Sequence, residues 1–322
     1  MKQCEVLSIL GAGTMGHSIA LAAAWAGFEV MVWGNSEQDI ERGKQGVREK
    51  ARILQQYEAI ASQDECRRIE ERIVFSGSME ECLMRATFVI EAVPENLPLK
   101  QELFKKLDGI CGPEVILASN TSGLSPTEIA SFTSKPERTV VTHFWNPAHL
   151  IPLVEVVRGE QTSDETVKRA MKLLKEMNKK PIVVQKDVLG SIGNRLQYAL
   201  FREAQYLLEQ GVATLEDIDA AVRYSIGRRL PVTGPFMTAD MGGLDVFDSI
   251  SNYLFPDFSD AQESLPTMRR LVDDGNYGQK TGKGFYEWTP EMSEKMNRER
   301  ERELIEWVKK DRLAEQENSI KR

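Results

Sequence analysis

Cysteine, histidine and long apolar runs are scarce in this sequence of 322 residues, and each shortage excludes a class of protein. The four cysteines lie far apart, without paired spacing or nearby histidines, which argues against a disulfide framework and against a zinc site. No apolar run reaches the roughly 18 residues of a membrane-spanning helix. We therefore expect no metal, no membrane span, and reduced thiols at Cys4, Cys66, Cys82 and Cys111.

A surplus of positive charge is also missing. The formal net charge is −8, whereas nucleic-acid binding draws on clustered Lys and Arg, so nucleic acid is disfavoured as the main partner. The segment Met1–Glu5 runs straight into a strand-like stretch and leaves no room for the apolar region of a signal peptide. We expect a cytoplasmic protein.

The residues that are present make up a globular mixture, with 41% hydrophobic and 28% charged residues. The chain is longer than the roughly 100 to 200 residues of a typical domain, so we expect two domains. The pattern changes near Asp187. We predict a first domain over residues 1–187, a helical domain over 188–290 and a charged helical tail over 291–322.

Short apolar runs alternate with helical patterns through the first domain, which predicts a parallel, doubly wound sheet of the α/β class. The predicted helices between the strands include Met15–Ala26 and Leu97–Leu107. The predicted strands are Val6–Leu10, Glu29–Trp33, Ile73–Ser76, Phe88–Ala92, Val115–Ser119, Thr139–Phe144 and Pro181–Val184.

Helical periodicity replaces this alternation in the second domain. Apolar residues recur at helical spacing over Ser191–Gln210, and Thr214 with Asp217 resembles a capping box that opens a further helix. The second domain is therefore expected to be all-α. The few apolar anchors of the tail predict a helix that rests on its own subunit or, alternatively, forms a dimer contact; they are Leu304, Ile305, Trp307 and Val308.

A glycine-rich motif, Gly11-Ala12-Gly13-Thr14-Met15-Gly16, follows the first strand and opens the first helix. In this context the first glycine permits a tight turn, the second lets the backbone approach a pyrophosphate, and the third allows close helix–strand packing. The N-terminus of the helix attracts negative charge. The motif predicts a Rossmann-type dinucleotide site, with cofactor-binding residues Gly11, Gly13, Thr14, Met15 and Gly16.

The acidic residue that binds the adenosine ribose should end the second strand, about 20 residues farther on. The chain instead reads Trp33-Gly34-Asn35-Ser36, which leaves Asn35 as the candidate contact. Without a carboxylate the site would not repel a 2′-phosphate, but no Arg or Lys follows until Arg42. We expect NAD as the cofactor, with NADP as the open alternative.

One of the three histidines, His143, lies near the end of a predicted strand, and Glu155 follows in a returning strand after an Asn-Pro turn. Such a hairpin could bring the carboxylate beside the imidazole, where it fixes the tautomer and favours the protonated form. A histidine held in this way suits general acid–base catalysis. We expect His17 to be a partly exposed helix residue, with contact to the cofactor as the alternative, and His149 to lie at a pocket rim or on a plain surface.

Taken in order along the chain, these motifs resemble the L-3-hydroxyacyl-CoA dehydrogenase family from about Glu5 to Trp288. In the first domain they are Gly11 to Gly16, Glu91-Ala92-Val93-Pro94-Glu95-Asn96, Ser119-Asn120-Thr121-Ser122, His143 to Asn146 and Leu153-Val154-Glu155. In the second they are Gly193-Asn194-Arg195, Gly234-Pro235-Phe236, Gly243-Leu244-Asp245 and Lys280-Thr281-Gly282-Lys283-Gly284-Phe285-Tyr286.

The resemblance implies the roles of these residues. His143 would remove the 3-hydroxyl proton while hydride passes to the nicotinamide, with Glu155 orienting the imidazole. Ser122 and Asn194 would bind the reacting oxygen. The residues that would line the nicotinamide and its ribose are Glu95, Lys100 and Asn120. The resemblance further implies fatty acid metabolism, a homodimer through the helical domain, and a small-molecule substrate that is a CoA thioester.

The sequence departs from the acyl-CoA pattern at several positions. Tyr57 stands where family members often carry a lysine for the CoA nucleotide, although Lys50 and Arg52 lie nearby. Leu189-Gly190-Ser191 replaces the usual Pro-Gly-Phe before Asn194, and Trp145 adds bulk beside His143. Other stretches resemble the branches that act on free hydroxy acids, namely L-gulonate 3-dehydrogenase (lambda-crystallin) and carnitine dehydrogenase; they are the charged tail, Asn146-Pro147-Ala148-His149-Leu150-Ile151-Pro152 and Asn194-Arg195-Leu196-Gln197-Tyr198. Another relative oxidises a hydroxymethyl pyridine carboxylate or its aldehyde.

Two rival interpretations are weaker. A β-hydroxyacid dehydrogenase of the 6-phosphogluconate type depends on a lysine in its helical domain, where this chain has Asn194 and Arg195. A non-enzymatic dinucleotide-binding protein would need none of the residues His143, Glu155, Ser122 and Asn194.

Overall fold

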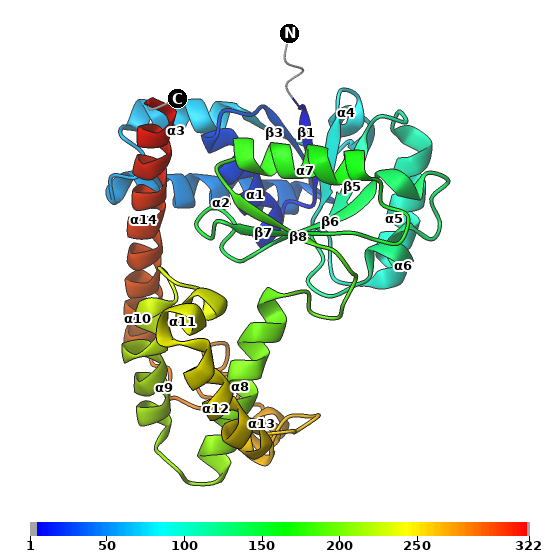
Figure 1. Cartoon of the computed structure of the whole chain (residues 1–322). Helices are drawn as coiled ribbons and strands as arrows, with labels where there is room; N and C mark the ends of the chain where they lie inside the picture. Colours follow the sequence, from blue (N-terminus) through cyan, green and yellow to red (C-terminus); the bar gives the residue numbers. More distant parts are fainter. Residues whose placement is uncertain (1–4, 321–322) are drawn as a thin grey trace. The chain divides into compact units, whose positions relative to one another are not determined.

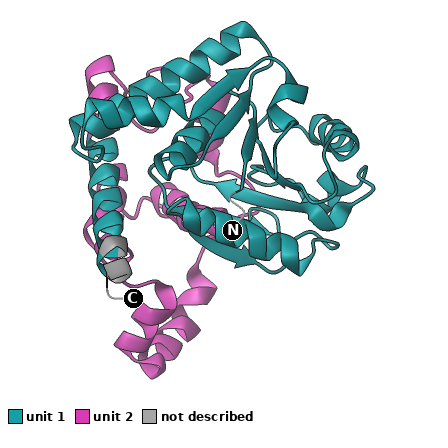
Figure 2. Cartoon of the chain, turned by 90° about the horizontal axis from the view of Figure 1, so that it is seen from above, with its two compact units in different colours: residues 1–192, 299–322 teal, residues 193–298 magenta. Residues whose placement is uncertain are grey.

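The computed structural model describes residues 5–320, and for residues 315, 316 and 318–320 it describes the backbone alone. Cys4 therefore lies outside the described residues, whereas Cys66, Cys82 and Cys111 are buried free thiols. The chain forms two compact units, one of residues 1–192 and 299–322 and one of residues 193–298 (Figure 2).

The first unit contains a sheet whose strands alternate with helices (Figure 1). The strands are β1 (Leu7–Leu10), β2 (Val30–Trp33), β3 (Ile73–Ser76), β4 (Phe88–Glu91), β5 (Ile116–Ser119), β6 (Thr139–Phe144), β7 (Leu153–Val157) and β8 (Lys180–Val184). The helices are α1 (Thr14–Trp25), α2 (Glu37–Gln56), α3 (Gln63–Glu71), α4 (Met79–Leu83), α5 (Leu97–Ile110), α6 (Pro126–Ala130) and α7 (Asp164–Glu176).

Within the described residues the strand order is β3-β2-β1-β4-β5-β6-β7-β8. Strands β1 to β6 are parallel to one another, β7 runs antiparallel to β6, and β8 is parallel to β7. The order reverses between β1 and β4, as in a doubly wound sheet. The predicted fold class is confirmed, and the returning strand after the Asn-Pro turn is β7.

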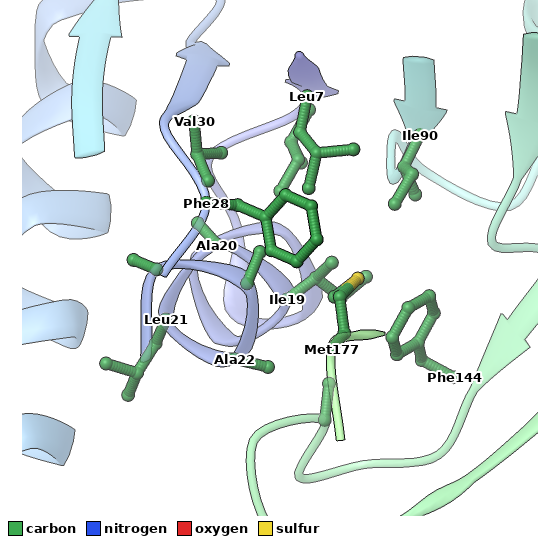
Figure 3. Close-up of a cluster of buried hydrophobic side chains, with 14 of the residues drawn as sticks. Leu7, Ile19, Ala20, Leu21, Ala22, Phe28, Val30, Ile90, Phe144 and Met177 are labelled. Atoms are coloured by element: carbon green, nitrogen blue, oxygen red, sulfur yellow. The ribbon is translucent and has the colours of Figure 1, made fainter. Parts of the chain in front are cut away.

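Apolar side chains cover both faces of the sheet because successive residues of a strand point to opposite sides. Leu7 and Ile9 belong to the core that also contains α1 and α7 residues, whereas Leu10 packs with Phe104 of α5 on the other face. Figure 3 shows the first of these cores, with Ile19 of α1 near Phe28, and with Leu21 pointing away from them on another side of the helix. Burial on both faces explains why the strands read as continuous apolar runs.

The second unit is helical. It contains α8 (Gly193–Glu209), α9 (Leu215–Tyr224), α10 (Ile226–Arg229), α11 (Pro235–Gly242), α12 (Leu244–Leu254) and α13 (Pro266–Asp273). The Thr214 side chain accepts a hydrogen bond from the backbone N–H of Asp217, so the predicted cap of α9 is confirmed.

The charged tail is one helix, α14 (Pro290–Ile320), which belongs to the first unit from Glu299 onward. Ile305 is fully buried in the core of the first unit, and Leu304 and Val308 pack against that core. This part of α14 therefore rests on its own subunit. No helix of residues 5–320 combines the length and apolar character that crossing a membrane requires.

Candidate active site

The predicted site residues of the first unit gather at one edge of the sheet. Parallel strands end at the same edge, and ligands of doubly wound sheets bind outside these carboxyl ends where the strand order reverses. The glycine motif follows β1, Glu95 follows β4, Asn120 and Ser122 follow β5, and His143 lies near the end of β6.

The glycine motif forms a tight turn between β1 and α1. Gly11 has a φ of +118°, and a Cβ added there would lie 2.6 Å from the carbonyl oxygen of Ala92. A Cβ on Gly16 would lie 1.7 Å from the Gly11 oxygen, so this glycine is required for the close approach of α1 to the loop. A Cβ on Gly13, in contrast, would meet nothing within 4 Å.

This geometry fits a dinucleotide. Gly13 and Thr14 are exposed at the N-terminus of α1, where backbone N–H groups and the helix dipole favour a pyrophosphate, and Met15 is half-buried behind them. The Gly11 N–H donates to the Trp33 oxygen at 3.0 Å, which places the end of β2 beside the loop. Asn35 is exposed just beyond that end and remains the candidate ribose contact.

A buried carboxylate, Glu91, lies at the end of β4 and binds side chains of the neighbouring segments. It is fully buried and accepts hydrogen bonds from Lys100 Nζ at 2.6 Å and from the Ser119 hydroxyl at 2.5 Å. Lys100 is 1% exposed and also lies 3.4 Å from a Glu95 oxygen. Lys100 therefore joins Glu91 and Glu95. The sequence did not indicate a role for Glu91, because its burial depends on neighbouring strands.

Glu95 and Asn120 fix the loops that follow β4 and β5. A Glu95 oxygen accepts from the Thr121 hydroxyl at 2.5 Å and from the Ser122 backbone N–H at 3.1 Å. The Asn120 side-chain oxygen accepts from the Phe144 N–H at 2.8 Å, which ties the end of β5 to the end of β6. Ser122 is exposed in this loop. Asn194 is in α8 of the second unit, so its part in the site stays a prediction.

The structure brings His143 and Glu155 together. They are direct cross-strand partners in β6 and β7, and His143 Nδ1 lies 2.9 Å from Glu155 Oε2. His143 is 5% exposed and Glu155 is fully buried. Because an ionised carboxylate only accepts hydrogen bonds, we assign the proton to Nδ1, which makes Nε2 the nitrogen that can accept a proton.

Two further groups bond to the Glu155 carboxylate. The Trp145 indole N–H donates to Oε2 at 3.3 Å, and the Ile192 backbone N–H donates to Oε1 at 2.8 Å. The sequence indicated only the bulk of Trp145, because the direction of an indole N–H depends on the fold. Nothing in the sequence indicated Ile192, because its contribution is a backbone group.

The sequence predicted the wrong environment for the other two histidines. His17 is buried, not partly exposed, since α2 approaches it at Gly46, where an added Cβ would lie 2.5 Å from the imidazole. Its Nε2 lies 3.0 Å from Lys50 Nζ, and burial, together with the Lys50 charge, lowers its pKa.

His149 is likewise buried rather than on a rim or a surface. Its backbone N–H donates to the Ser18 hydroxyl, which in turn lies 2.8 Å from His149 Nδ1 and can donate to it. Burial lowers the pKa of His149 to about 3, with a further contribution from the Lys50 and Lys179 charges. Burial also lowers the pKa of Lys179 to about 7.

Two family models match most of the chain. One is described as "3-hydroxyacyl-CoA dehydrogenase, NAD binding domain" and matches residues 6–188. The other is described as "3-hydroxyacyl-CoA dehydrogenase, C-terminal domain" and matches residues 190–288. The matches end at residue 288, so they leave α14 out.

Curated relatives match in sequence. The chain is 35% identical over 300 residues to 5-formyl-3-hydroxy-2-methylpyridine 4-carboxylate 5-dehydrogenase of Mesorhizobium japonicum, covering 93% of this chain and 96% of the relative. It is 38% identical to a probable 3-hydroxybutyryl-CoA dehydrogenase of Bacillus subtilis, covering 90% and 100%. It is 37% identical to L-carnitine dehydrogenase of Pseudomonas aeruginosa, covering 76% and 74%.

Solved structures match as well. A crystal structure of a 5-formyl-3-hydroxy-2-methylpyridine 4-carboxylic acid 5-dehydrogenase, described as an NAD+-dependent dismutase, has a TM-score of 0.88 and 33% identity, covering 96% of this chain and 99% of that one. The (S)-3-hydroxybutyryl-CoA dehydrogenase of Ralstonia eutropha has a TM-score of 0.74 and 36% identity, covering 89% and 100%.

Proposed function

Since the chain belongs to the 3-hydroxyacyl-CoA dehydrogenase family, we propose that it oxidises the hydroxyl-bearing carbon of a hydroxy acid or of its CoA ester, with His143 as the base. Members of this family are NAD-dependent dehydrogenases acting on CH–OH groups, and NAD is the cofactor. The observation that carries the proposal is the 2.9 Å pair of His143 and Glu155, at the sheet edge that also bears the glycine loop.

NAD supplies the hydride acceptor, and residues of the chain accept and return the proton. His143 takes the hydroxyl proton at Nε2, because Nδ1 donates to Glu155. The buried Glu155 carboxylate stabilises the imidazolium that forms. In the reverse direction the same imidazolium returns the proton to the carbonyl oxygen.

The remaining roles are proposals of the same kind. Ser122 and Asn194 hold the reacting oxygen, and Asn120 and Glu95 lie against the nicotinamide and its ribose. Lys100 supports these residues from inside the protein, because it is buried between the Glu91 and Glu95 carboxylates.

A CoA thioester, oxidised from the L-3-hydroxyacyl to the 3-oxoacyl form, is the substrate that the resemblance favours. Both family models and the name of the Bacillus relative support this substrate class.

The position of α14 favours a second class, an un-esterified hydroxy acid. Lys309 Nζ donates to the backbone oxygen of Tyr57 at 3.2 Å, and Tyr57 packs against the core that contains Ile305. Helix α14 thus lies on the residue that stands where the family often carries its lysine for the CoA nucleotide. The pyridine carboxylate enzyme also covers more of this chain than the Ralstonia CoA-ester enzyme, 96% against 89%. We regard the free acid as the better supported substrate.

Reduced-cofactor absorbance tests the substrate class. Purified protein is assayed with NAD, then NADP, against L-3-hydroxybutyryl-CoA, free L-3-hydroxybutyrate, L-carnitine, L-gulonate and a hydroxymethyl pyridine carboxylate. We expect a higher kcat/KM with a free acid and NAD than with the CoA ester. A CoA-ester signal far above that of every free acid would show that the substrate is an acyl-CoA.

We also propose a homodimer through the helical unit. Large apolar side chains are exposed on that unit, including Phe236 at 88% and Met241 at 76%. Monomeric proteins rarely expose contiguous apolar patches larger than a few hundred Å². A second copy of the chain would cover them, in keeping with the dimer that the resemblance implies.

A further inference from the structure

The Glu155 carboxylate is held from more than one side. It is fully buried, and its two oxygens receive different donors. Oε2 accepts from His143 Nδ1 at 2.9 Å and from the Trp145 indole N–H at 3.3 Å, and Oε1 accepts from the Ile192 backbone N–H at 2.8 Å. A buried carboxylate stays ionised only when hydrogen-bond donors replace the water it has lost.

Trp145 is the one of these partners whose contribution can be changed without altering the dyad or the backbone. It follows β6, two residues after His143, and its ring is half-buried. The indole and imidazole ring centroids are 5.6 Å apart, with the planes tilted by 44°. A phenylalanine at this position would keep an aromatic ring beside the imidazole but would lack the N–H that points at Glu155.

The hydrogen bond from the Trp145 indole N–H restricts the orientation of the Glu155 carboxylate. A glutamate side chain can rotate its carboxylate, and a partial turn that moves both oxygens away from Nδ1 would leave His143 without an acceptor. With Oε1 held by Ile192 and Oε2 shared by His143 and Trp145, rotation breaks several bonds at once. Ionised acceptors make the stronger hydrogen bonds in proteins.

We propose that Trp145 is a positioning residue, whose indole N–H holds the Glu155 carboxylate in the orientation that keeps Nε2 of His143 ready to take the substrate proton. This inference rests on the proposed function, because it assumes that His143 is the base. Trp145 acts only through Glu155 and contributes no group to the proton transfer itself.

A double-mutant cycle tests the proposal. Trp145→Phe should lower kcat about 3- to 10-fold, since the lost hydrogen bond is a long one to an ionised group. The KM for NAD should stay unchanged, because the glycine loop is not touched. In the Glu155→Ala background the same substitution should have no further effect, since no side-chain acceptor is left for the indole N–H. Trp307→Phe, on an exposed face of α14, is the matched control and should leave turnover unchanged.

A spectroscopic measurement covers the case in which Trp145→Phe fails to fold. In protein labelled with ¹⁵N-tryptophan, which has five indole signals, Glu155→Gln should move one indole N–H signal far more than the others. The proposal is overturned if no indole signal moves, or if a folded Trp145→Phe keeps full turnover or loses equally in both backgrounds.

Failure of the proposed function gives a different result. If His143→Gln and Glu155→Gln both keep full turnover, the dyad itself is wrong. If both lose turnover while Trp145→Phe does not, only the role of Trp145 is wrong.

Discussion

At the scale of single residues, the glycines of the β1–α1 loop differ in what they contribute. Gly11 and Gly16 are required by the fold, since a Cβ on either would collide with backbone oxygen. Gly13 has open space around it. The sequence motif assigned a tight turn to Gly11 and close packing to Gly16, and the structure agrees with both assignments, whereas the binding role of Gly13 stays a prediction.

Gly13→Ala should therefore fold normally and bind NAD poorly. We expect an unchanged melting temperature and an affinity for reduced cofactor at least about 10-fold weaker, because the methyl group would occupy the space needed for backbone approach to the pyrophosphate. Calorimetry and fluorescence titration check both values. Gly16→Ala is the contrasting variant, with a large loss of stability. Normal NAD binding by Gly13→Ala would contradict this placement of the pyrophosphate.

His149 predicts a dependence of stability on pH. Its folded pKa is about 3, and in the unfolded chain the imidazole titrates near 6.5, so between these values only the unfolded chain binds the proton. Stability from this group is present above about pH 6.5 and is lost as the pH falls toward 3.

We expect the wild type to lose about 1 to 3 kcal/mol more unfolding free energy than His149→Gln between about pH 6.5 and pH 4.5. Urea titrations of both proteins at several pH values measure the difference. Parallel pH curves for the two proteins would mean that His149 does not titrate as its burial indicates.

The sequence predicted some site residues better than others, for physical reasons. A local hairpin places Glu155 against His143, so spacing alone indicated the pair. His17 and His149 are buried by contacts with segments remote in sequence, such as Gly46 for His17 and Ser18 for His149, and a single sequence does not show those contacts.

At the scale of elements, α14 lies beyond the part of the chain that the family models match. The family match ends at residue 288, yet Leu304, Ile305 and Val308 of α14 pack on the core beside α2. The strand ranges could be predicted because buried parallel strands are short, continuous apolar runs. The docking of α14 could be expected only from a few apolar anchors in a charged segment.

Ile305→Ala should destabilise the first unit by about 2 to 5 kcal/mol, since it leaves a cavity at a fully buried site. Leu313→Ala, on the same helix but 60% exposed, is the matched control and should change stability by no more than about 0.5 kcal/mol. Chemical denaturation measures both. Equal, small effects of the two substitutions would show that α14 does not dock through Ile305.

At the scale of the whole molecule, the two units carry different features. The first carries the glycine loop and the dyad, and the second exposes many large apolar side chains, which we propose are covered by a second copy of the chain. The sequence indicated an all-α second domain, but its exposed apolar side chains became evident only in three dimensions.

Sedimentation should show a particle of twice the mass of one chain. Phe236→Asp should weaken this association by 10-fold or more, on the order of a hot-spot residue, because it places a charge in an apolar contact. Phe132→Asp, at an exposed phenylalanine of the first unit, should leave the mass unchanged. A monomeric wild type would contradict the proposed dimer.

The turnover of His143→Gln, measured together with its affinity for NAD, shows whether His143 is the base. If His143 is the base, turnover with the best substrate should fall by about 10² to 10⁴, while NAD affinity and melting temperature stay near those of the wild type. Turnover close to that of the wild type, in a folded variant that binds NAD, would show that another group takes the proton.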